Sequence, residues 1–457
     1  MEYISLWMFL VAVIFLLIGF PVAFSLGGTA VLFAVFGSDM LTHMGFGLPW
    51  EPVFRMARLN MLPARIFGNI MDNYALVAVP FFVFMGVMLE KSRLAEDLLE
   101  TMGVLFGRLR GGLAISVVVV GTLLAASTGV VGASVVTMGV LALPIMLRYN
   151  YDKGLASGVV AASGTLGQII PPSIVLIILG DQMGISVGDL FLGAFFPGLL
   201  LSGMFIVWIV LVAFVRPHAA PALPESARSM SHGDLIRRVL MSMTPPLLLI
   251  LIVLGTIFAG VATPTEAGAM GALGASILAL LNKRLNWDSL RAVMDQTVKL
   301  TSMVFVILLG ATTFTMVFAS LNGPHVVEAV LTNLPGAELG FLLFTMLVIF
   351  ILGFFIDFIE ITFIVIPVIV PIAAAFNIDP LWFAVLIAVN LQSSFLTPPF
   401  GFALFYLKGV APPAVRTIDI YRGIIPFIAV QLFALVLLWF FPELVTWLPH
   451  LSDAVQQ

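Results

Sequence analysis

The chain contains no cysteine, so disulfides, thiolate metal sites and cysteine nucleophiles are excluded. Charge is also scarce, because Asp, Glu, Lys and Arg make up only 10% of the 457 residues, against about 25% in an average soluble domain. The 20 Lys and Arg residues are scattered, which excludes a basic surface for nucleic acid. Hydrophobic residues account for 61% of the chain and provide for about ten spans of roughly 20 residues each. These proportions predict an all-α polytopic membrane protein that is not an enzyme.

Glycine and proline, in contrast, are abundant, with 40 and 27 residues. Plain lipid-facing helices need neither, and irregular backbone is tolerated in a bilayer only inside protein or beside water. The excess therefore predicts broken helices and re-entrant segments that line a transport path. Residues 1–5 lack the basic region of a signal peptide, so the first apolar run is expected to remain as a membrane helix. The five histidines show no i, i+4 pairing and suggest no metal site.

One long stretch, 216–243, is polar enough to be a linker, and it divides the chain into a first half, 1–215, and a second half, 244–457. Glycines and prolines recur in the same order in both halves, which indicates an internal repeat. Chance alignment of frequent residues is the alternative, but the order is kept over the whole length. Two repeats in one chain are typical of secondary transporters. The strongest matches share a separation of 227 residues and pair Pro144, Pro171 and Pro172 with Pro371, Pro398 and Pro399.

Each half is expected to contain a re-entrant hairpin followed by a broken helix. We place the hairpins at about 113–148 and 339–376, and the broken helices at about 154–180 and 381–408. Hairpins return to the side from which they entered, so each half crosses the membrane an odd number of times and the second repeat is inverted. Amphipathic segments at 94–110 and 324–334 are expected to lie flat as arms between a moving and a fixed part.

The basic residues predict the orientation of the chain. With the N-terminus outside, all but three of the 20 Lys and Arg residues fall on the cytoplasmic side, in agreement with the positive-inside rule. The exceptions are Arg55, Arg58 and Arg65. In this arrangement both termini lie outside the cytoplasm and 216–243 is a cytoplasmic linker.

The tip of the first hairpin is rich in small polar residues. A helix cannot keep its hydrogen bonds through a turn at Ser127, Thr128 and Gly129, and the freed groups must find partners inside protein or in a water-filled cavity. Hydroxyls and free carbonyls are also ligands that a hard monovalent cation accepts. From this segment alone, close helix packing by small residues is an equally good interpretation.

The first broken helix follows at Thr165, Gly167, Pro171, Pro172 and Ser173. The two prolines remove two backbone donors and break the helix. The freed carbonyls can coordinate a cation, while the N-terminus of the next half-helix, near Ser173, offers donors and a positive dipole to an anion. A plain kink is the alternative.

The second repeat carries two carboxylates, Asp357 and Glu360, in its hairpin. Carboxylates inside a membrane are costly, so each is a functional candidate. The alternative is a structural pairing with a backbone amide or helix N-terminus. The second broken helix, between Asn390 and Gly401, repeats the double proline and adds an amide and hydroxyls. Glu266, at another helix start, is expected to act as a capping carboxylate.

With these motifs, the sequence resembles over essentially its whole length the large membrane subunit of the tripartite ATP-independent periplasmic (TRAP) transporters. In one-letter code, the motifs that carry the resemblance are GTLGQIIPPS (164–173), ATPTEA (262–267), LTPPFG (396–401) and GFPVA (19–23). The resemblance implies a multi-pass permease of the bacterial inner membrane with periplasmic termini. It also implies two partners, a small four-helix membrane subunit and a soluble periplasmic substrate-binding protein. The expected activity is sodium-coupled import of organic acids by an elevator-type transport domain moving against a scaffold.

The resemblance and the helix breaks together define the expected site, with sodium as the coupling ion and no other cofactor. The expected sodium ligands are Ser127, Thr128, Gly129 and Gly167, with Asp357, Asn390 and Thr397 from the second repeat. The expected substrate-binding residues are Thr165, Pro171, Pro172, Ser173, Glu360, Pro398, Pro399 and Gly401. The hairpin around Glu360 is similar to a branch that is often labelled for 2-oxo acids or lactate, a 2-hydroxy acid. At the position of Glu360 the sequence differs from the C4-dicarboxylate and sialic-acid branches of the family.

Two other functions fit parts of the sequence. A stand-alone sodium/carboxylate symporter would share the inverted-repeat architecture and would need no partner. An intramembrane hydrolase could use Asp357 with a second acid, but the Gly-x-Gly-Asp signature of intramembrane aspartyl proteases is missing.

Overall fold

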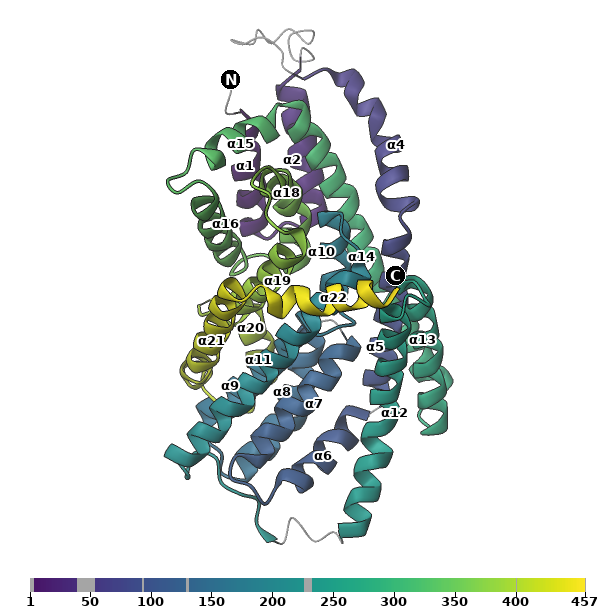
Figure 1. Cartoon of the computed structure of the whole chain (residues 1–457), viewed down its shortest axis with the longest axis vertical. Coiled ribbons are helices and arrows are strands. Elements are labelled where there is room, and N and C mark those ends of the chain that lie inside the picture. Colours follow the sequence, from purple (N-terminus) through teal and green to yellow (C-terminus); the bar gives the residue numbers. More distant parts are fainter. Residues whose placement is uncertain are drawn as a thin grey trace. The chain divides into compact units, whose positions relative to one another are not determined.

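The computed structural model describes residues 4–38, 54–92, 94–128, 131–225, 232–399 and 401–456, and the side chains of 94–95, 125–128, 232 and 453–456 lie outside the description. Within these ranges every regular element is a helix (Figure 1). Seven of the described helices are long and apolar enough to cross a membrane, or up to eight if a bent pair counts as one span. The prediction of an all-α polytopic membrane protein is confirmed.

The chain forms two compact units, each with segments from both halves of the sequence. The first unit comprises Met1–Leu76 and Lys299–Pro380, and the second unit comprises Val77–Val298 and Leu381–Gln457. These units do not test the repeat boundaries 1–215 and 244–457, which stay a prediction. In the described part of the proposed linker, residues up to 225 are irregular, and helix α12 begins at His232.

The first unit contains the N-terminal helices and the second hairpin. Its core includes a ring cluster in which Phe9 lies edge-on to Phe314 at 5.2 Å and to Phe318 at 4.9 Å. Gly19, with a φ of +96°, provides the turn between the first two helices. The helices are α1 (Ile4–Ile18), α2 (Val22–Phe36), η1 (Met56–Met61), α4 (Leu62–Ile66), η2 (Phe67–Met71), α15 (Gly323–Thr332), α16 (Glu338–Leu352), α17 (Phe358–Ile364) and α18 (Ile366–Ala375), with the C-terminal part of α14 (Trp287–Ser320).

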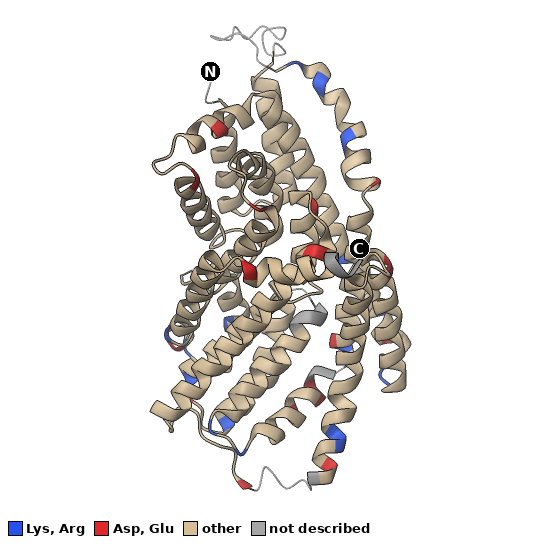
Figure 2. Ribbon diagram, viewed as in Figure 1, with Lys and Arg blue, Asp and Glu red and all other residues tan. Residues whose placement is uncertain are grey.

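The second unit contains the first hairpin and both broken helices. In sequence order its helices are α5 (Tyr74–Lys91), α6 (Leu94–Phe106), α7 (Gly112–Thr128), α8 (Val131–Arg148), α9 (Lys153–Thr165), η3 (Leu166–Gln168), α10 (Ile174–Met183), α11 (Val187–Val215), α12 (His232–Phe258), α13 (Pro264–Leu281), α19 (Pro380–Leu396), α20 (Phe402–Val410), α21 (Thr417–Phe440) and α22 (Glu443–Gln456). In this unit, Lys and Arg positions lie mainly towards helix ends (Figure 2). The apolar middle of each helix is therefore available for the membrane.

Glycines allow close contacts between a broken helix of one half and a long helix of the other half. A Cβ atom on Gly423 of α21 would collide with the carbonyl of Gly154, and one on Gly158 would collide with the carbonyl of Gly423. In the counterpart contact, a Cβ on Gly193 of α11 would lie 3.1 Å from Leu381 at the start of α19. Small residues allow such backbone approach between membrane helices. The first broken helix, α9, thus packs closely on α21 of the second half, whereas α19 reaches α11 at Gly193 through the side chain of Leu381.

Candidate functional site

The first helix break lies between α9 and α10 and is buried throughout. The α-helix ends at Thr165, one 3₁₀ turn follows, and Pro171 and Pro172 carry the chain to an extended Ser173. Every residue from 161 to 180 is buried. The freed backbone groups therefore lie inside protein, as a membrane requires of irregular backbone.

The second break lies between α19 and α20 and is half-exposed. It runs through Thr397, Pro398 and Pro399 to Gly401, the residue before α20. A Cβ atom on Gly401 would lie 3.0 Å from the backbone nitrogen of Thr397, so only glycine fits this turn without a shift. The hydroxyl of Tyr421 on α21 donates to the carbonyl of Pro399 at 2.9 Å. Both Pro-Pro bonds, at 171–172 and 398–399, are cis.

The two broken helices meet through a buried hydrogen bond. The Nε2 of Gln392 donates to the Oγ1 of Thr165 over 3.3 Å, and that hydroxyl donates in turn to the carbonyl of Ala162 at 2.9 Å. Both side chains are 0% exposed. The polar parts of the two halves are therefore joined in the core of the second unit.

Two glutamine side chains at this junction keep unpaired atoms. Both amide atoms of Gln168 and the Oε1 of Gln392 are buried and have no hydrogen-bond partner among the described residues. A buried polar atom without a partner costs about 1–3 kcal/mol, so such atoms mark places where a polar ligand can bind. An amide NH₂ can donate to a carboxylate, and an amide oxygen can coordinate a cation.

The sequence did not predict a role for either glutamine. Gln168 lies within the GTLGQIIPPS motif, and Gln392 lies two residues after Asn390 in the second broken helix. The available signal was two long amides in otherwise apolar or small-residue segments. The partner of Gln392 could not be predicted, because its hydrogen bond to Thr165 joins residues 227 positions apart.

The first hairpin packs on both broken helices. A Cβ on Gly121 of α7 would lie 2.6 Å from the Cβ of Ser163, and one on Gly164 would collide with Val135 of α8. Helices α7, α8 and α9 accordingly lie side by side (Figure 1). On its other face, a Cβ on Gly139 of α8 would lie 2.7 Å from Val410 on α20. Helices α7 and α8 thus contact the first broken helix at α9, and α8 also contacts the second at α20.

The sodium ligands expected in the first hairpin lie at the edge of the described residues. Ser127 and Thr128 end α7, but their side chains lie outside the described residues, and Gly129 lies outside them entirely. Their role as sodium ligands stays a prediction.

The structure places the other expected residues of the breaks in the second unit. Ser173 donates its hydroxyl to the carbonyl of Gln168 at 3.0 Å, and Thr397 donates to the carbonyl of Ser393 at 2.8 Å. A hydroxyl that donates its proton keeps its lone pairs for a cation. Asn390 is 2% exposed on α19. The residues brought together in this unit are Thr165, Gly167, Pro171, Pro172, Ser173, Asn390, Thr397, Pro398, Pro399 and Gly401. Their sodium and substrate roles stay predictions.

Asp357 and Glu360 lie in the first unit and form a capping box at the start of α17. The Oδ1 of Asp357 accepts from the backbone N–H of Phe358 at 2.7 Å, and the Oε2 of Glu360 accepts from the N–H of Asp357 at 3.0 Å. Both residues are half-buried. This geometry supports the structural alternative for the pair. An additional role in binding sodium or substrate stays a prediction.

The interpretation of Glu266 as a helix cap is confirmed. Its Oε2 accepts from the backbone N–H of Thr263 at 2.8 Å, while the Thr263 hydroxyl accepts from the N–H of Glu266 at 3.3 Å. The pair is a capping box at the start of α13.

Comparison with known proteins identifies the family. The model of the tripartite ATP-independent periplasmic transporter, DctM component, matches residues 9–444. The chain belongs to this family. It is 28% identical over 474 residues to the C4-dicarboxylate TRAP transporter large permease protein DctM of Vibrio cholerae, covering 97% of both chains. It is also 29% identical to the sialic acid TRAP transporter large permease protein SiaM of the same species, covering 95% of each.

Among solved structures, this TRAP transporter component is similar in fold to the YdaH transporter of Alcanivorax borkumensis. The TM-score is 0.61 at 14% sequence identity, and the match covers 92% of this chain and 98% of YdaH. At this identity the similarity concerns the fold alone.

Proposed function

We propose that this TRAP component is the large permease subunit of a sodium-coupled importer of organic acids in the bacterial inner membrane, with both termini in the periplasm. A soluble periplasmic binding protein delivers the substrate, and a small four-helix membrane subunit completes the complex. Family membership supports this assignment. The structural observation that carries the proposal is the buried junction of Thr165 and Gln392, with unpaired amide atoms beside two broken helices.

Sodium is proposed to bind to oxygens of the breaks and of the first hairpin. Hydroxyls, amide oxygens and carbonyls freed by the double prolines are oxygen ligands that suit a hard cation. Asn390, Thr397 and Gly167 supply such groups from the second unit. Asp357 is proposed to contribute a carboxylate and keeps its Oδ1 on the cap of α17.

The substrate carboxylate is proposed to bind where the half-helices begin. The first N–H groups of α10, after Ser173, and of α20, after Gly401, have no partner within their own helices and attract an anion. The amide Nε2 of Gln168 adds a buried donor. Relatives named for C4-dicarboxylates and sialic acid support an organic acid as cargo, and Glu360 favours a 2-oxo or 2-hydroxy acid within that class. Elevator movement of the part that carries the breaks would expose the site alternately to the two sides.

Sodium-dependent uptake into proteoliposomes tests the site. Thr165→Val and Thr397→Val should each lower the initial rate at least about tenfold, since each removes an oxygen from the proposed site. Thr313→Val is the matched control, because Thr313 has the same bond to the carbonyl four residues before it, at 2.8 Å, as Thr397. Wild-type uptake by Thr165→Val, Thr397→Val and Asp357→Asn together would show that the site is assigned wrongly.

A substitution at Asp357 can separate its proposed role in sodium binding from its role as a helix cap. Asparagine is as good an N-cap as aspartate, so Asp357→Asn keeps the helix start and removes only the charge. We expect the half-saturating sodium concentration to rise about tenfold with unchanged thermal stability, which corresponds to the loss of a single charge-assisted contact. An unchanged sodium dependence would show that Asp357 acts only as a helix cap and does not bind sodium.

Omission of each partner tests the tripartite requirement. Uptake should disappear when either the binding protein or the small subunit is left out of the reconstitution. Uptake that persists with the permease alone would favour a stand-alone symporter instead.

A further inference from the structure

A pocket of about 300 Å³ lies in the second unit where α9 begins and α11 ends. Its polar lining lies on or directly beside three helices. These residues are Asp152 before α9, Trp208 on α11, Arg216 directly after α11 and Arg422 on α21. Small-molecule sites span about 300–1,000 Å³, so the pocket has room for a small charged group. None of these residues belongs to the helix breaks.

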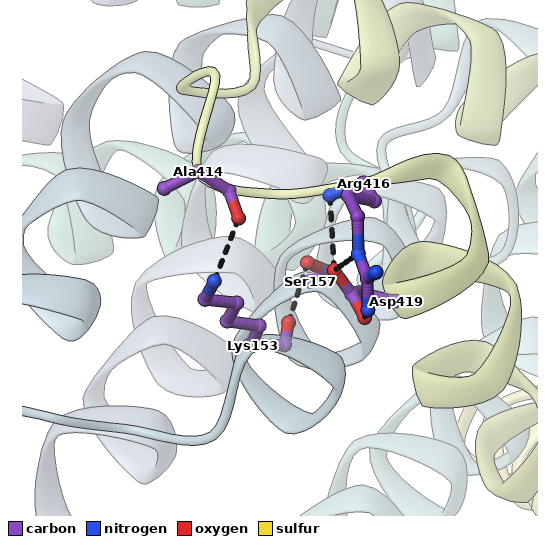
Figure 3. A network of polar contacts seen from close by, with 5 residues as sticks. All are labelled: Lys153, Ser157, Ala414, Arg416 and Asp419. Carbon is purple, nitrogen blue, oxygen red and sulfur yellow. Dashed lines mark hydrogen bonds and ion pairs between the residues drawn. The ribbon is translucent and has the colours of Figure 1, made fainter.

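Within the described part of the chain, the two arginines of this pocket have no polar partner, whereas neighbouring charged residues do. The described residues provide no ion pair or hydrogen bond for the guanidinium of Arg216 or Arg422. Close by, Lys153 donates to the carbonyl of Ala414 at 2.8 Å, and Arg416 pairs with Asp419 at 3.4 Å (Figure 3).

The acidic residue of the pocket already has a structural partner. The Oδ1 of Asp152 accepts from the backbone N–H of Leu155 at 2.9 Å and caps α9. The lining therefore holds two guanidinium groups and one carboxylate, and that carboxylate is already engaged at a helix N-terminus. The lining is net positive and suits an anion.

The pocket lies at the depth of lipid headgroups. Helix α11 has 29 residues, which corresponds to a length of about 43 Å at 1.5 Å per residue. The hydrocarbon core is only about 30 Å thick, so Arg216, just beyond the helix, lies in the headgroup region. Trp208 lies eight residues earlier, about 12 Å deeper along the helix axis.

Apolar side chains on the same helices are exposed next to the pocket. On α11, Val215 is 66% exposed and Leu211 is 51% exposed, and on α21 Ile425 is 58% exposed. On helices that cross a membrane, such side chains face acyl chains. A ligand that combines an anionic head with apolar tails would contact both surfaces, whereas a soluble anion would contact only the arginines.

We propose that this pocket binds the phosphate of an anionic phospholipid, with Arg216 and Arg422 as its ligands and the acyl chains along α11 and α21. Basic pockets between membrane helices are typical sites for anionic headgroups. The indole N–H of Trp208 supplies a further donor. A bound lipid would join α11 and α21, which come from different halves of the sequence.

Lipid titration of the delipidated protein in detergent tests the proposal. Phosphatidylglycerol should bind saturably, as measured by native mass spectrometry, and phosphatidylcholine should not. Each arginine near an anionic headgroup contributes about fivefold in affinity. Arg216→Gln with Arg422→Gln should therefore weaken phosphatidylglycerol binding about 25-fold. Arg422→Lys should keep most of the affinity, since the charge remains.

Arg291→Gln is the matched control, because Arg291 is an exposed arginine on α14 outside the pocket, and this variant should bind as the wild type does. Unchanged elution and thermal stability in lipid-free detergent will show that the double variant is folded. Equal binding by the double variant and the wild type would overturn the proposal. So would full competition by inorganic phosphate, which would identify a site for a free anion rather than a lipid.

Discussion

Gln392 donates a hydrogen bond to Thr165 across a separation of 227 residues, the same separation that relates the double prolines 171–172 and 398–399. Residues at matching positions of the proposed repeats are therefore in direct contact. Such a contact arises when two copies meet near the axis that relates them. The proposed repeat predicts such a meeting point, and the Thr165–Gln392 bond is a direct contact between the two broken helices of this TRAP component.

The Thr165–Gln392 bond should show energetic coupling. Thr165→Val and Gln392→Leu each leave a buried partner unsatisfied, which costs about 1–3 kcal/mol. The double variant loses the same bond only once, so the fall in its Tm in detergent should be smaller than the sum of the two single changes. Ser157→Ala combined with Gln392→Leu is the control, since Ser157 bonds independently to the carbonyl of Lys153. Strict additivity of Thr165→Val and Gln392→Leu would show that the bond contributes nothing.

The contact of α9 with α21 should not tolerate a methyl group. Gly423→Ala places a Cβ against the carbonyl of Gly154, and overpacking of this kind costs about 1–3 kcal/mol. Its Tm should fall and sodium-dependent uptake should fall with it. Gly203→Ala on α11 is the control, because a Cβ there meets nothing within 4 Å and alanine favours a helix by about 0.5–1 kcal/mol. If Gly423→Ala were as stable as Gly203→Ala, the helices would not approach as closely as described.

The helix breaks could be predicted from the sequence because their cause is local. Pro171 and Pro172 cannot donate in a helix, and neither can Pro398 and Pro399, whatever surrounds them. The cap at Glu266 is local in the same way, since Thr263 lies three residues earlier. Local signals were therefore enough to predict the breaks and the cap.

The junction of the breaks could not be predicted because its cause is tertiary. The bond between Gln392 and Thr165 depends on how the two halves pack, and the sequence alone does not give that packing. Asp357 combines both kinds of cause. The structural alternative of a helix-start pairing is local, because Glu360 three residues later completes a capping box, whereas the predicted ion site depends on tertiary packing and stays a prediction.

The Thr263–Glu266 capping box should affect stability and not transport. Thr263→Ala should lower the stability of the protein by about 1 kcal/mol, as the loss of an N-cap typically does. Glu266→Gln should retain the Tm, since an amide oxygen still accepts from the N–H of Thr263. Both variants should import at the wild-type rate per folded molecule, measured after thermal and elution profiles confirm folding. A loss of uptake in stable Glu266→Gln would instead assign the carboxylate to transport.

The proposed orientation can be tested directly because the chain has no cysteine, so each introduced cysteine is the sole thiol. Arg65→Cys lies in the segment between α2 and α5 that we place in the periplasm, and Arg291→Cys lies near the start of α14, on the side that we place in the cytoplasm. Both native residues are exposed. A membrane-impermeant maleimide added to intact spheroplasts should label Arg65→Cys and spare Arg291→Cys, and lysis should make both reactive. The reverse pattern would invert the orientation and place the Arg216–Arg422 pocket at the periplasmic leaflet. Labelling of both sites before lysis would contradict the odd number of crossings that separates the two positions.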